Sequence, residues 1–331
     1  MKKRVLLLFL FLAPLLLWAA CGKSVPPPNT DAALTQIRVV LDWTPNTNHS
    51  GLYAALAQGW FAEEGIEVEI MQPPEDGAMV LLAAGDADFG ISFQEELGPA
   101  IARENPMPLM AVAAIINHNT SGIMSLAQTG IHSAGDLEGK KFASWETPLV
   151  YAIMRNLVEA DGGDFARVNM IPNAATDAIS ALQSDMDAIW IYYAWDGIAA
   201  EIAGLEINYL DFGRVNPLFD FYTPVLVVNS DFAAANPGVV KGFVRAASRG
   251  YDFAAANPDQ SAEFLLQYAP QLNRALVLAS QRYLAPLYQG DAPRWGEIDA
   301  SRWSAFYRWM FEEGLLEKDI QSGGFSNEYL P

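Results

Sequence analysis

The sequence predicts an α/β protein built from two lobes. Short apolar, β-branched runs alternate with helix-like segments along most of the chain, which is typical of mainly parallel sheets covered by helices. The chain has 331 residues, and a chain of about 300 residues exceeds what one hydrophobic core usually serves. Several predicted strands end in loops that carry aromatic or polar side chains. Because ligands of open α/β sheets bind at the carboxyl ends of strands, these loops form the candidate site.

The first 20 residues have the pattern of an export signal. A basic segment at residues 2–4 precedes an apolar run at residues 5–17, which is too short for a comfortable transmembrane helix. The Ala-Ala-Cys-Gly sequence that follows resembles a bacterial lipoprotein cleavage site and predicts a lipid on Cys21; ordinary secretory cleavage is the alternative. We expect the proline-rich residues 21–36 to tether an extracytoplasmic protein to the cell membrane.

Composition excludes several classes of protein. Cys21 is the only cysteine and there are three histidines, so neither a disulfide framework nor a structural metal site is expected. The formal charge of −19 becomes −22 when the three basic residues of the signal are removed. A protein with this large negative charge is not expected to bind nucleic acid. Nine Trp, 12 Tyr and 17 Phe supply rings for a core and for an aromatic cleft.

The segment 39–70 reads as a strand, a loop, a helix and a second strand. Its loop places Trp43, Asn46 and His49 at a strand's carboxyl end, and Pro45 prevents the helix from beginning before Asn46. These three side chains are therefore candidates for ligand contact. The structural alternative is a core tryptophan, a capping asparagine and a histidine bonded at the helix start.

This segment resembles the first strand–helix–strand unit of the substrate-binding proteins related to yeast thiamine-pyrimidine synthase, a family that includes bacterial binding proteins for thiamine precursors. The matching motif is Trp43, Pro45, Asn46, His49 and Tyr53, followed by the Gly59-Trp60-Phe61 turn. The resemblance extends over roughly residues 37–285. It implies the periplasmic-binding-protein-like fold of the second type, in which a ligand binds between two lobes joined by a hinge.

A second candidate loop follows the strand that ends near Ser92. Phe93, Gln94 and Glu95 stand there between a strand and a helix, so they are expected at the same sheet edge as the first loop. The alternative is that Ser92 caps the helix with Glu95 completing a capping box.

Two further loops belong to the second lobe. Trp145 stands after a strand and just before a helix whose first turn contains Pro148. The run from Trp190 to Trp195 cannot bury every ring, since neighbours on a strand face opposite ways. The candidate ligand residues of this run are Tyr192, Tyr193 and Trp195, with Asp196 directly after it. The resemblance implies that such aromatic and carboxylate side chains hold an aminopyrimidine.

Two polar breaks divide the lobes, one near residues 117–122 and the other near 213–224. We therefore expect lobe I to comprise residues 37–118 and 222–331, and lobe II to comprise residues 119–221. His118 lies in the first break, and a structural role in a hinge or turn is favoured for it over ligand contact.

The resemblance implies a binding protein that captures a small flat heterocycle, closes around it and delivers it to an ABC-type permease. Such a protein is not an enzyme, carries no cofactor or metal, and is a single subunit. A thiamine pyrimidine precursor of the hydroxymethylpyrimidine or formylaminopyrimidine class is the favoured ligand, and riboflavin is the alternative. A lower alternative is an enzyme that builds the pyrimidine from pyridoxal phosphate with His49. A lipoprotein scaffold without a small ligand is a third possibility.

Overall fold

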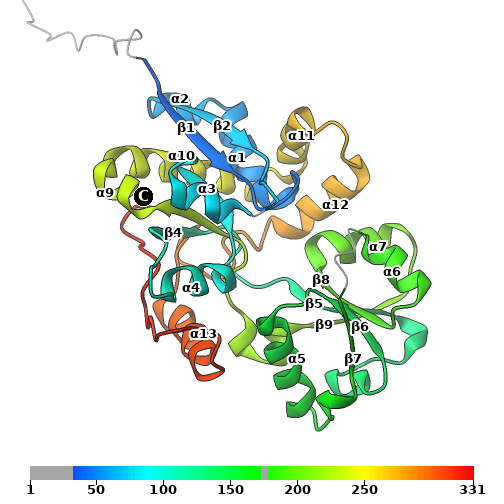
Figure 1. The fold of residues 1–331 in the computed structure, drawn as a ribbon. Helices are drawn as coiled ribbons and strands as arrows, with labels where there is room; N and C mark the ends of the chain where they lie inside the picture. The colour runs from blue at the N-terminus through cyan, green and yellow to red at the C-terminus, as the bar shows by residue number, and fades with distance from the viewer. Residues whose placement is uncertain (1–32, 76, 173–176) are drawn as a thin grey trace, which may run out of the picture. The chain divides into compact units, whose positions relative to one another are not determined.

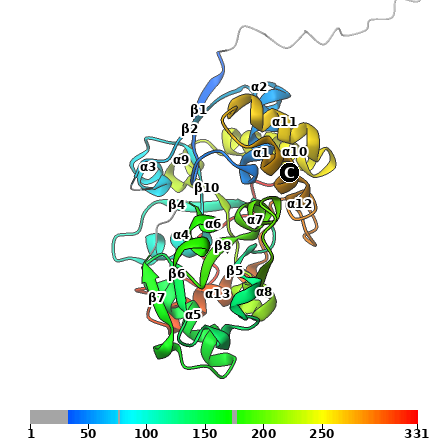
Figure 2. The ribbon, with the colours of Figure 1, turned by 90° about the vertical axis from the view of Figure 1, so that its right-hand side faces the viewer.

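The protein forms two five-stranded sheets, seen here in a computed structural model that describes residues 33–75, 77–172 and 177–331 (Figures 1 and 2). The predicted signal and Cys21 lie outside these residues, and so does most of the predicted tether. In spatial order, the first sheet contains β2 (Ile66–Met71), β1 (Thr35–Val40), β3 (Phe89–Ser92), β10 (Val225–Asn229) and β4 (Leu109–Ala114). The second contains β7 (Asn169–Pro172), β6 (Lys141–Ser144), β8 (Ala188–Tyr192), β5 (Ser121–Leu126) and β9 (Ile207–Asp211).

Both sheets are mixed in the same way. In the first sheet β1 pairs in parallel with β2 and β3, whereas β10 is antiparallel to β3 and β4. In the second sheet β6 pairs in parallel with β7 and β8, and β5 is antiparallel to β8 and β9. One strand in each sheet is thus reversed and the other four point the same way. The expected mainly parallel direction holds, although half of the pairings are antiparallel.

Registers bring the carboxyl ends of the parallel strands to one edge of each sheet. Val40 pairs with Met71 at the end of β1, and the reversed β10 begins opposite Ser92, where β3 ends. In the second sheet Ala143 of β6 pairs with Ile189 of β8. The loops that follow β1, β3, β6 and β8 therefore emerge at the edges where ligands of open α/β sheets bind.

Helices cover both faces of the first sheet. Val39 of β1 and Phe89 of β3 belong to a core with α1 and α10, in which the Phe89 and Phe243 rings stack with centroids 3.9 Å apart. Val40 faces the opposite way and belongs to a core with α3 and α4. The helices are α1 (Ser50–Ala57), α2 (Trp60–Glu63), α3 (Ala78–Ala84), α4 (Gln94–Ala102), α9 (Ser230–Ala235), α10 (Pro237–Ala256), α11 (Pro258–Tyr268), α12 (Arg274–Leu284) and α13 (Ala300–Glu312).

The second sheet is also buried on both faces. Trp190 of β8 packs edge-on against Phe212, whereas Ile189 and Ile191 face a smaller core that contains Leu182. Its helices are α5 (Pro148–Ala160), α6 (Ala178–Ser184), α7 (Ile198–Ile202) and α8 (Phe212–Val215). Short 3-10 turns are Thr47–His49, Ala127–Thr129, Ala134–Leu137, Phe165–Arg167 and Pro217–Phe219, and Tyr193–Gly197 is a π-helical turn.

The helix expected within residues 39–70 is two helices. Gly59 adopts a φ of 73°, which a residue with a side chain rarely adopts, so α1 ends before it and α2 begins after it. The 3-10 turn that leads into α1 starts directly after Asn46, as Pro45 predicted. No helix in the described ranges is long and apolar enough to cross a membrane.

The two predicted breaks between the lobes lie side by side. The Asp220 carboxylate accepts a hydrogen bond from the Asn119 amide at 2.8 Å and lies 2.6 Å from His118 Nδ1. Arg302 donates to Asp220 at 3.0 Å and to the Asn117 carbonyl at 2.6 Å. His118 does not line the cavity described below. The lobe boundaries themselves stay a prediction.

Candidate functional site

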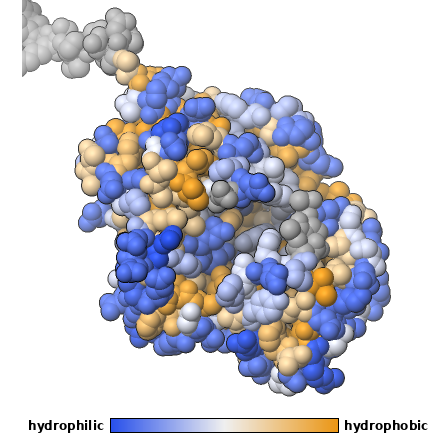
Figure 3. Space-filling model, in the orientation of Figure 1, coloured by the Kyte–Doolittle hydropathy of each residue, from blue (hydrophilic) through white to orange (hydrophobic). Residues whose placement is uncertain are grey.

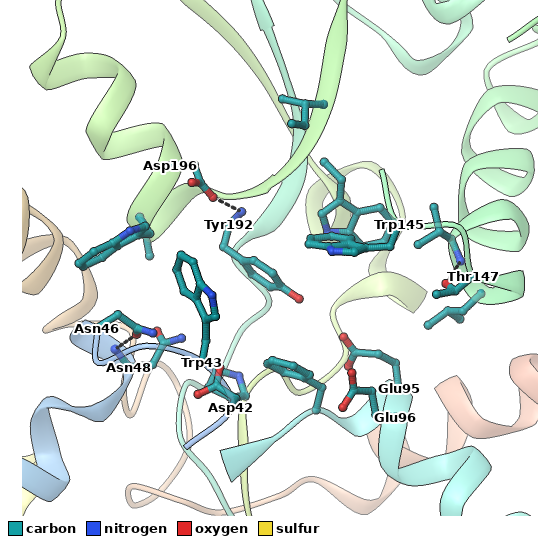
Figure 4. A pocket seen from close by; sticks show the side chains of 18 of the residues that line it. Asp42, Trp43, Asn46, Asn48, Glu95, Glu96, Trp145, Thr147, Tyr192 and Asp196 are labelled. Atoms are coloured by element: carbon teal, nitrogen blue, oxygen red, sulfur yellow. Dashed lines mark hydrogen bonds between the residues drawn. The ribbon is translucent and has the colours of Figure 1, made fainter. Parts of the chain in front are cut away.

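A cavity of about 840 Å³ gathers the loops that follow β1, β3, β6 and β8 (Figure 4). A hollow near the centre of one molecular face is visible in Figure 3. Twenty-five residues line the cavity: Asp42, Trp43, Asn46, Thr47, Asn48, Met79, Phe93, Glu95, Glu96, Pro99, Trp145, Thr147, Pro148, Leu149, Val150, Ala178, Ile189, Trp190, Tyr192, Ala194, Trp195, Asp196, Pro224, Met310 and Leu315. Eight of the eleven predicted ligand residues are among them.

The loop after β1 is held open by its own side chains. Asn46 Oδ1 accepts from the Asn48 amide at 2.8 Å, and the Asn46 amide donates to His49 Nδ1 at 3.2 Å. Because Nδ1 accepts, His49 Nε2 carries the proton, and it donates to Asp42 Oδ1 at 2.5 Å. Trp43, 44% exposed, projects from this braced loop into the cavity (Figure 4).

His49 itself does not face the cavity. Its side chain is fully buried and both ring nitrogens are engaged within the loop. The expected ligand contact of His49 is therefore corrected: the residue braces the loop that presents Trp43 and Asn46.

The loop after β3 presents two glutamates. Helix α4 begins at Gln94 and has Phe93 as its N-cap, without a side-chain cap hydrogen bond. Ser92 Oγ donates to Glu96 Oε2 at 3.3 Å, so the alternative of a Ser92–Glu95 capping box is wrong. Glu95 Oε2 is out of contact with solvent and has no hydrogen-bond partner in the described structure. Burial raises the pKa of Glu95 well above its usual range, and it also raises the pKa of Glu96, which is the more exposed of the two side chains and lines the cavity.

Gln94 points away from the cavity. Its Oε1 accepts from the Tyr222 amide at 2.8 Å, and its Nε2 donates to the Trp303 carbonyl at 3.1 Å. Ligand contact by Gln94 is therefore corrected, because both ends of its amide are bonded within the protein.

The loop after β6 places Trp145 at the cavity. Thr147 Oγ1 accepts from the Val150 amide at 3.3 Å and caps α5, whose first residue is Pro148, as predicted. Trp145 is 44% exposed and contacts Trp190 edge-to-face with ring centroids 6.2 Å apart. The Trp145 ring therefore has free surface on the cavity side.

The π-helical turn after β8 orients the side chains that follow Tyr192. Such turns are rare and occur frequently at functional sites. Trp195 and Asp196 both line the cavity from this turn. Asp196 Oδ2 accepts from the Tyr192 amide at 3.4 Å, and burial raises the pKa of Asp196 to about 6. Figure 4 shows the Tyr192 ring lying between Asp196 and the pair Glu95 and Glu96.

Tyr193 turns to the other side of the chain. Its ring packs at 4.7 Å from the ring of Tyr209 and at 5.2 Å from that of Tyr283, and its hydroxyl donates to Glu201. A Cβ on Gly197 would lie 2.4 Å from the Tyr193 ring, so the turn requires glycine there. The expected ligand contact of Tyr193 is corrected: Tyr193, the first residue of the π-helical turn, packs against the core that contains Ile191, whereas Tyr192, the last residue of β8, lines the cavity.

The cavity lining carries four carboxyl groups and, among the described residues, no lysine, arginine or histidine. The carboxyls belong to Asp42, Glu95, Glu96 and Asp196. Carboxylates accept hydrogen bonds and attract cations. The lining therefore suits amines and protonated nitrogens and disfavours anions.

Sequence reasoning missed several lining residues. Asp42 and Glu96 adjoin predicted residues, so extending each candidate loop by one position would have included them. Met79 and Met310 come from helices and carry no local signal, because only packing brings them to the cavity. Ser280 of α12 does not line the cavity, but its hydroxyl lies 2.6 Å from that of the lining residue Thr47, a contact that no local pattern predicts.

Comparison with known proteins identifies relatives of similar length. The Formylaminopyrimidine-binding protein of Halalkalibacterium halodurans is 29% identical over 321 residues, which cover 93% of this chain and 94% of the relative. The Riboflavin-binding protein RibY of Chloroflexus aurantiacus is 25% identical over 95% of this chain and 91% of its own. A Legionella pneumophila relative named 4-amino-5-hydroxymethyl-2-methylpyrimidine phosphate synthase is 22% identical over 90% and 93%.

Solved structures confirm the predicted fold. The nitrate-binding protein NrtA from Synechocystis PCC 6803 gives a TM-score of 0.70 at 14% identity, over 89% of this chain and 87% of that one. The alkanesulfonate-binding protein SsuA from Xanthomonas axonopodis pv. citri gives 0.67 at 15% identity, over 89% and 99%. The two-lobed α/β fold of type II periplasmic binding proteins is thus shared. The family model described as "NMT1/THI5 like" matches residues 46–261, more than half of the chain, and the protein belongs to that family.

Proposed function

We propose that this protein is an extracytoplasmic solute-binding component of an ABC importer, and that it captures a thiamine pyrimidine precursor of the hydroxymethylpyrimidine or formylaminopyrimidine class. The observation that carries the proposal is the meeting of Trp43, Tyr192, Trp195 and Asp196 on one cavity. These four residues come from both sheets, so a ligand among them would contact both.

The residue chemistry supports a flat, amine-bearing ring as the ligand. Trp43 and Tyr192 offer ring faces on which a pyrimidine can stack, worth about 0.5–1.5 kcal/mol per aromatic pair beyond the buried area. Asp196 supplies a carboxyl that can accept from an exocyclic amine or a protonated ring nitrogen. Asn46 lines the same cavity, but its Oδ1 accepts from the Asn48 amide and its Nδ2 donates to the Thr44 carbonyl at 3.1 Å, so its main part is to hold the loop that presents Trp43.

In this proposal binding is coupled to movement of the two lobes. Lobe I is residues 37–118 and 222–331, and lobe II is residues 119–221. A ligand bound to loops of both lobes would favour closure about the connections near 117–122 and 213–224. The closed form would then be recognised by a membrane permease, with the protein kept at the membrane by a lipid on Cys21 and acting as a single subunit.

Riboflavin is the alternative ligand. A cavity of about 840 Å³ is large for a single pyrimidine ring, since pockets for drug-sized ligands span about 300–1,000 Å³. The relationship to the riboflavin-binding RibY supports the same alternative.

We further propose that the protein binds its ligand without converting it. Relatives named as synthases leave an enzymatic role open within the family. In this chain the histidine of the shared motif, His49, is buried with both ring nitrogens bonded. The described cavity residues also offer no lysine for a Schiff base and no cationic side chain for a phosphate.

The proposal is tested by titrating the purified protein with 4-amino-5-hydroxymethyl-2-methylpyrimidine and, in parallel, with riboflavin, while following tryptophan fluorescence. Saturable quenching by the pyrimidine is expected, since three tryptophans of the loops adjoin the cavity: Trp43, Trp145 and Trp195. Saturable quenching by riboflavin alone would indicate that riboflavin is the ligand. If neither compound changed the fluorescence, the proposed capture of this class of ligand would be wrong.

Substitution locates the site within the same titration. Trp195→Ala should weaken pyrimidine binding by about tenfold or more while the protein stays folded. The matched control is Trp60→Ala, because Trp60 packs against Phe253 and Arg249 outside the cavity. Equal affinity of the two variants would remove Trp195 from the proposed site.

A further inference from the structure

The four carboxyls of the cavity fall into two separate groups. Asp196 lies on one side of the Tyr192 ring, and Glu95 and Glu96 lie side by side beyond its hydroxyl end (Figure 4). After burial, repulsion from Glu96 raises the pKa of Glu95, and the nearby Asp42 has the same effect on Glu96. Because the Tyr192 ring lies between Asp196 and the two glutamates, the glutamates form a subsite of their own (Figure 4).

The Glu95–Glu96 subsite has few internal partners. The Thr223 hydroxyl and the Glu95 amide partly offset the rise in the pKa of Glu95, but Glu95 Oε2 is shielded from solvent and has no hydrogen bond within 3.5 Å in the described structure. The Glu96 carboxylate receives only the 3.3 Å bond from Ser92 there. No ion pair in the described ranges involves either glutamate. A buried carboxyl oxygen without a hydrogen bond is costly, and each such atom in a folded protein requires an explanation.

The position of the glutamates in the first turn of α4 does not supply that explanation. A helix N-terminus stabilises acidic side chains in its first turn. It gives no reason to shield Glu95 Oε2 from water without a hydrogen bond. A donor that arrives with the ligand would satisfy both carboxyls.

Aromatic rings frame the same subsite. Phe93 precedes the glutamates and stacks with Tyr192 at a centroid distance of 6.4 Å. Trp43 and Trp145 present exposed ring surface to the cavity. Ring faces attract cations as carboxylates do, and aromatic cages combined with acidic groups are a recurrent means of holding organic ammonium ions.

We propose that Glu95 and Glu96 form a second subsite that binds a positively charged nitrogen of the ligand, so that the protein selects an organic cation. This inference rests on the proposed function, in which the ligand's ring edge is read by Asp196. The cation would lie at the other end of the ligand, on the far side of Tyr192. The cavity of about 840 Å³ leaves room for a ligand that spans both subsites.

The experiment compares two isosteric probes by calorimetry at pH 7. One is 4-amino-5-aminomethyl-2-methylpyrimidine, whose aminomethyl group is protonated, and the other is the neutral 5-hydroxymethyl compound. The cationic probe should bind about tenfold more tightly, because a hydrogen bond between charged groups is stronger than one to a neutral donor. Glu95→Gln and Glu96→Gln should each remove most of this preference, because the amide that replaces the carboxyl group carries no charge.

The control variant is Glu159→Gln, since Glu159 is exposed on α5 and does not line the cavity. It should keep the full preference, and thermal unfolding checks that all three variants are folded. Equal affinity of the wild type for both probes would overturn the cation subsite while leaving pyrimidine capture intact. A preference that survives in the Glu95→Gln Glu96→Gln double variant would also overturn it.

Benzylamine and benzyl alcohol separate the two proposals further, because they form the same charged and neutral pair without a pyrimidine. If neither pyrimidine binds but benzylamine binds in preference to benzyl alcohol, pyrimidine capture fails and the cation subsite stands. If neither amine binds, the cation subsite fails whatever the neutral pyrimidine does.

Discussion

The hydroxyl groups of Thr47 and Ser280, 233 positions apart in sequence, lie 2.6 Å from each other. Ser280 Oγ also donates to the carbonyl of Ala194, so one buried serine links the loop after β1 to the π-helical turn after β8. Thr47 and Ala194 both line the cavity. The bridge therefore holds two halves of the candidate site in register.

Ser280→Ala should weaken ligand binding without removing any cavity residue. The loss of a buried hydrogen bond, with its partners left unsatisfied, is expected to cost about 1–3 kcal/mol of unfolding free energy. Urea denaturation measures that cost, and pyrimidine titration measures the affinity. The control is Ser304→Ala, because Ser304 bonds only within α13. An unchanged stability and affinity for Ser280→Ala would contradict the bridging role.

His49→Ala should lower stability and affinity together. The substitution leaves the Asn46 amide and the Asp42 carboxylate without their partner and opens a cavity in a fully buried position. We expect a loss of about 2–4 kcal/mol of unfolding free energy. His49→Asn, which can reach one of the two partners, should lose less. If His49→Ala instead lowered the ligand affinity while the free energy of unfolding stayed at the wild-type value, the result would favour direct ligand contact by His49.

Asp196→Asn should stabilise the protein at pH 7 and weaken its ligand binding. Burial raises the pKa of Asp196 to about 6, so the folded state holds a proton that the unfolded state releases near pH 4. Ionisation of Asp196 therefore costs stability as pH rises from about 4 to 6, by roughly 1–3 kcal/mol. Asparagine avoids that cost but accepts less strongly than a carboxylate.

The measurement is urea unfolding of wild type and Asp196→Asn at pH 4 and pH 7. The free energy of unfolding of Asp196→Asn should exceed that of the wild type by more at pH 7 than at pH 4. In the wild type, affinity for an amine-bearing probe should fall below about pH 6, as the Asp196 carboxylate takes up its proton. A wild type whose stability relative to the variant rises between pH 4 and 7 would contradict the assignment.

His118 should make the connection between the two sheets sensitive to pH. Hydrogen bonding to Asp220 is the largest of the causes that raise the pKa of His118, and Asp291 at 3.0 Å adds to it, while Arg302 opposes it. A histidine with a raised pKa in the folded state stabilises fully below its unfolded value of about 6.5 and less as pH rises through the folded value. Wild type should therefore lose stability relative to His118→Gln on passing from pH 6 to pH 8.5.

Chemical denaturation of both proteins at these two pH values tests the prediction. Asp220→Asn serves as the companion variant, since it removes the main partner of His118 and should flatten the pH dependence. A pH-independent difference between wild type and His118→Gln would rule the coupling out.

The sequence by itself determined the fold class and the loops of the candidate site. The alternation of strands and helices is a local pattern, and so is a ring or a polar group at the end of each of four strands. One predicted side chain from each of these four loops lines the cavity: Trp43, Glu95, Trp145 and Asp196. Proline restricts the backbone dihedral angles of its own and the preceding residue, and this effect is local. Pro45 therefore correctly predicted where the first helical turn begins.

Only the tertiary structure decided which side chains of those loops face the cavity. Gln94 and Tyr193 have the right chemistry and position in sequence, but each is bonded or packed against residues elsewhere in the fold. His49 is bonded within its own loop, as the alternative of a histidine bonded at the helix start predicted. The reversed strand in each sheet, the bridge through Ser280 and the contribution of Met310 likewise depend on pairing and packing between distant segments. Local pattern sets backbone conformation and burial, whereas the direction of a polar side chain depends on the partners that the completed fold brings within reach.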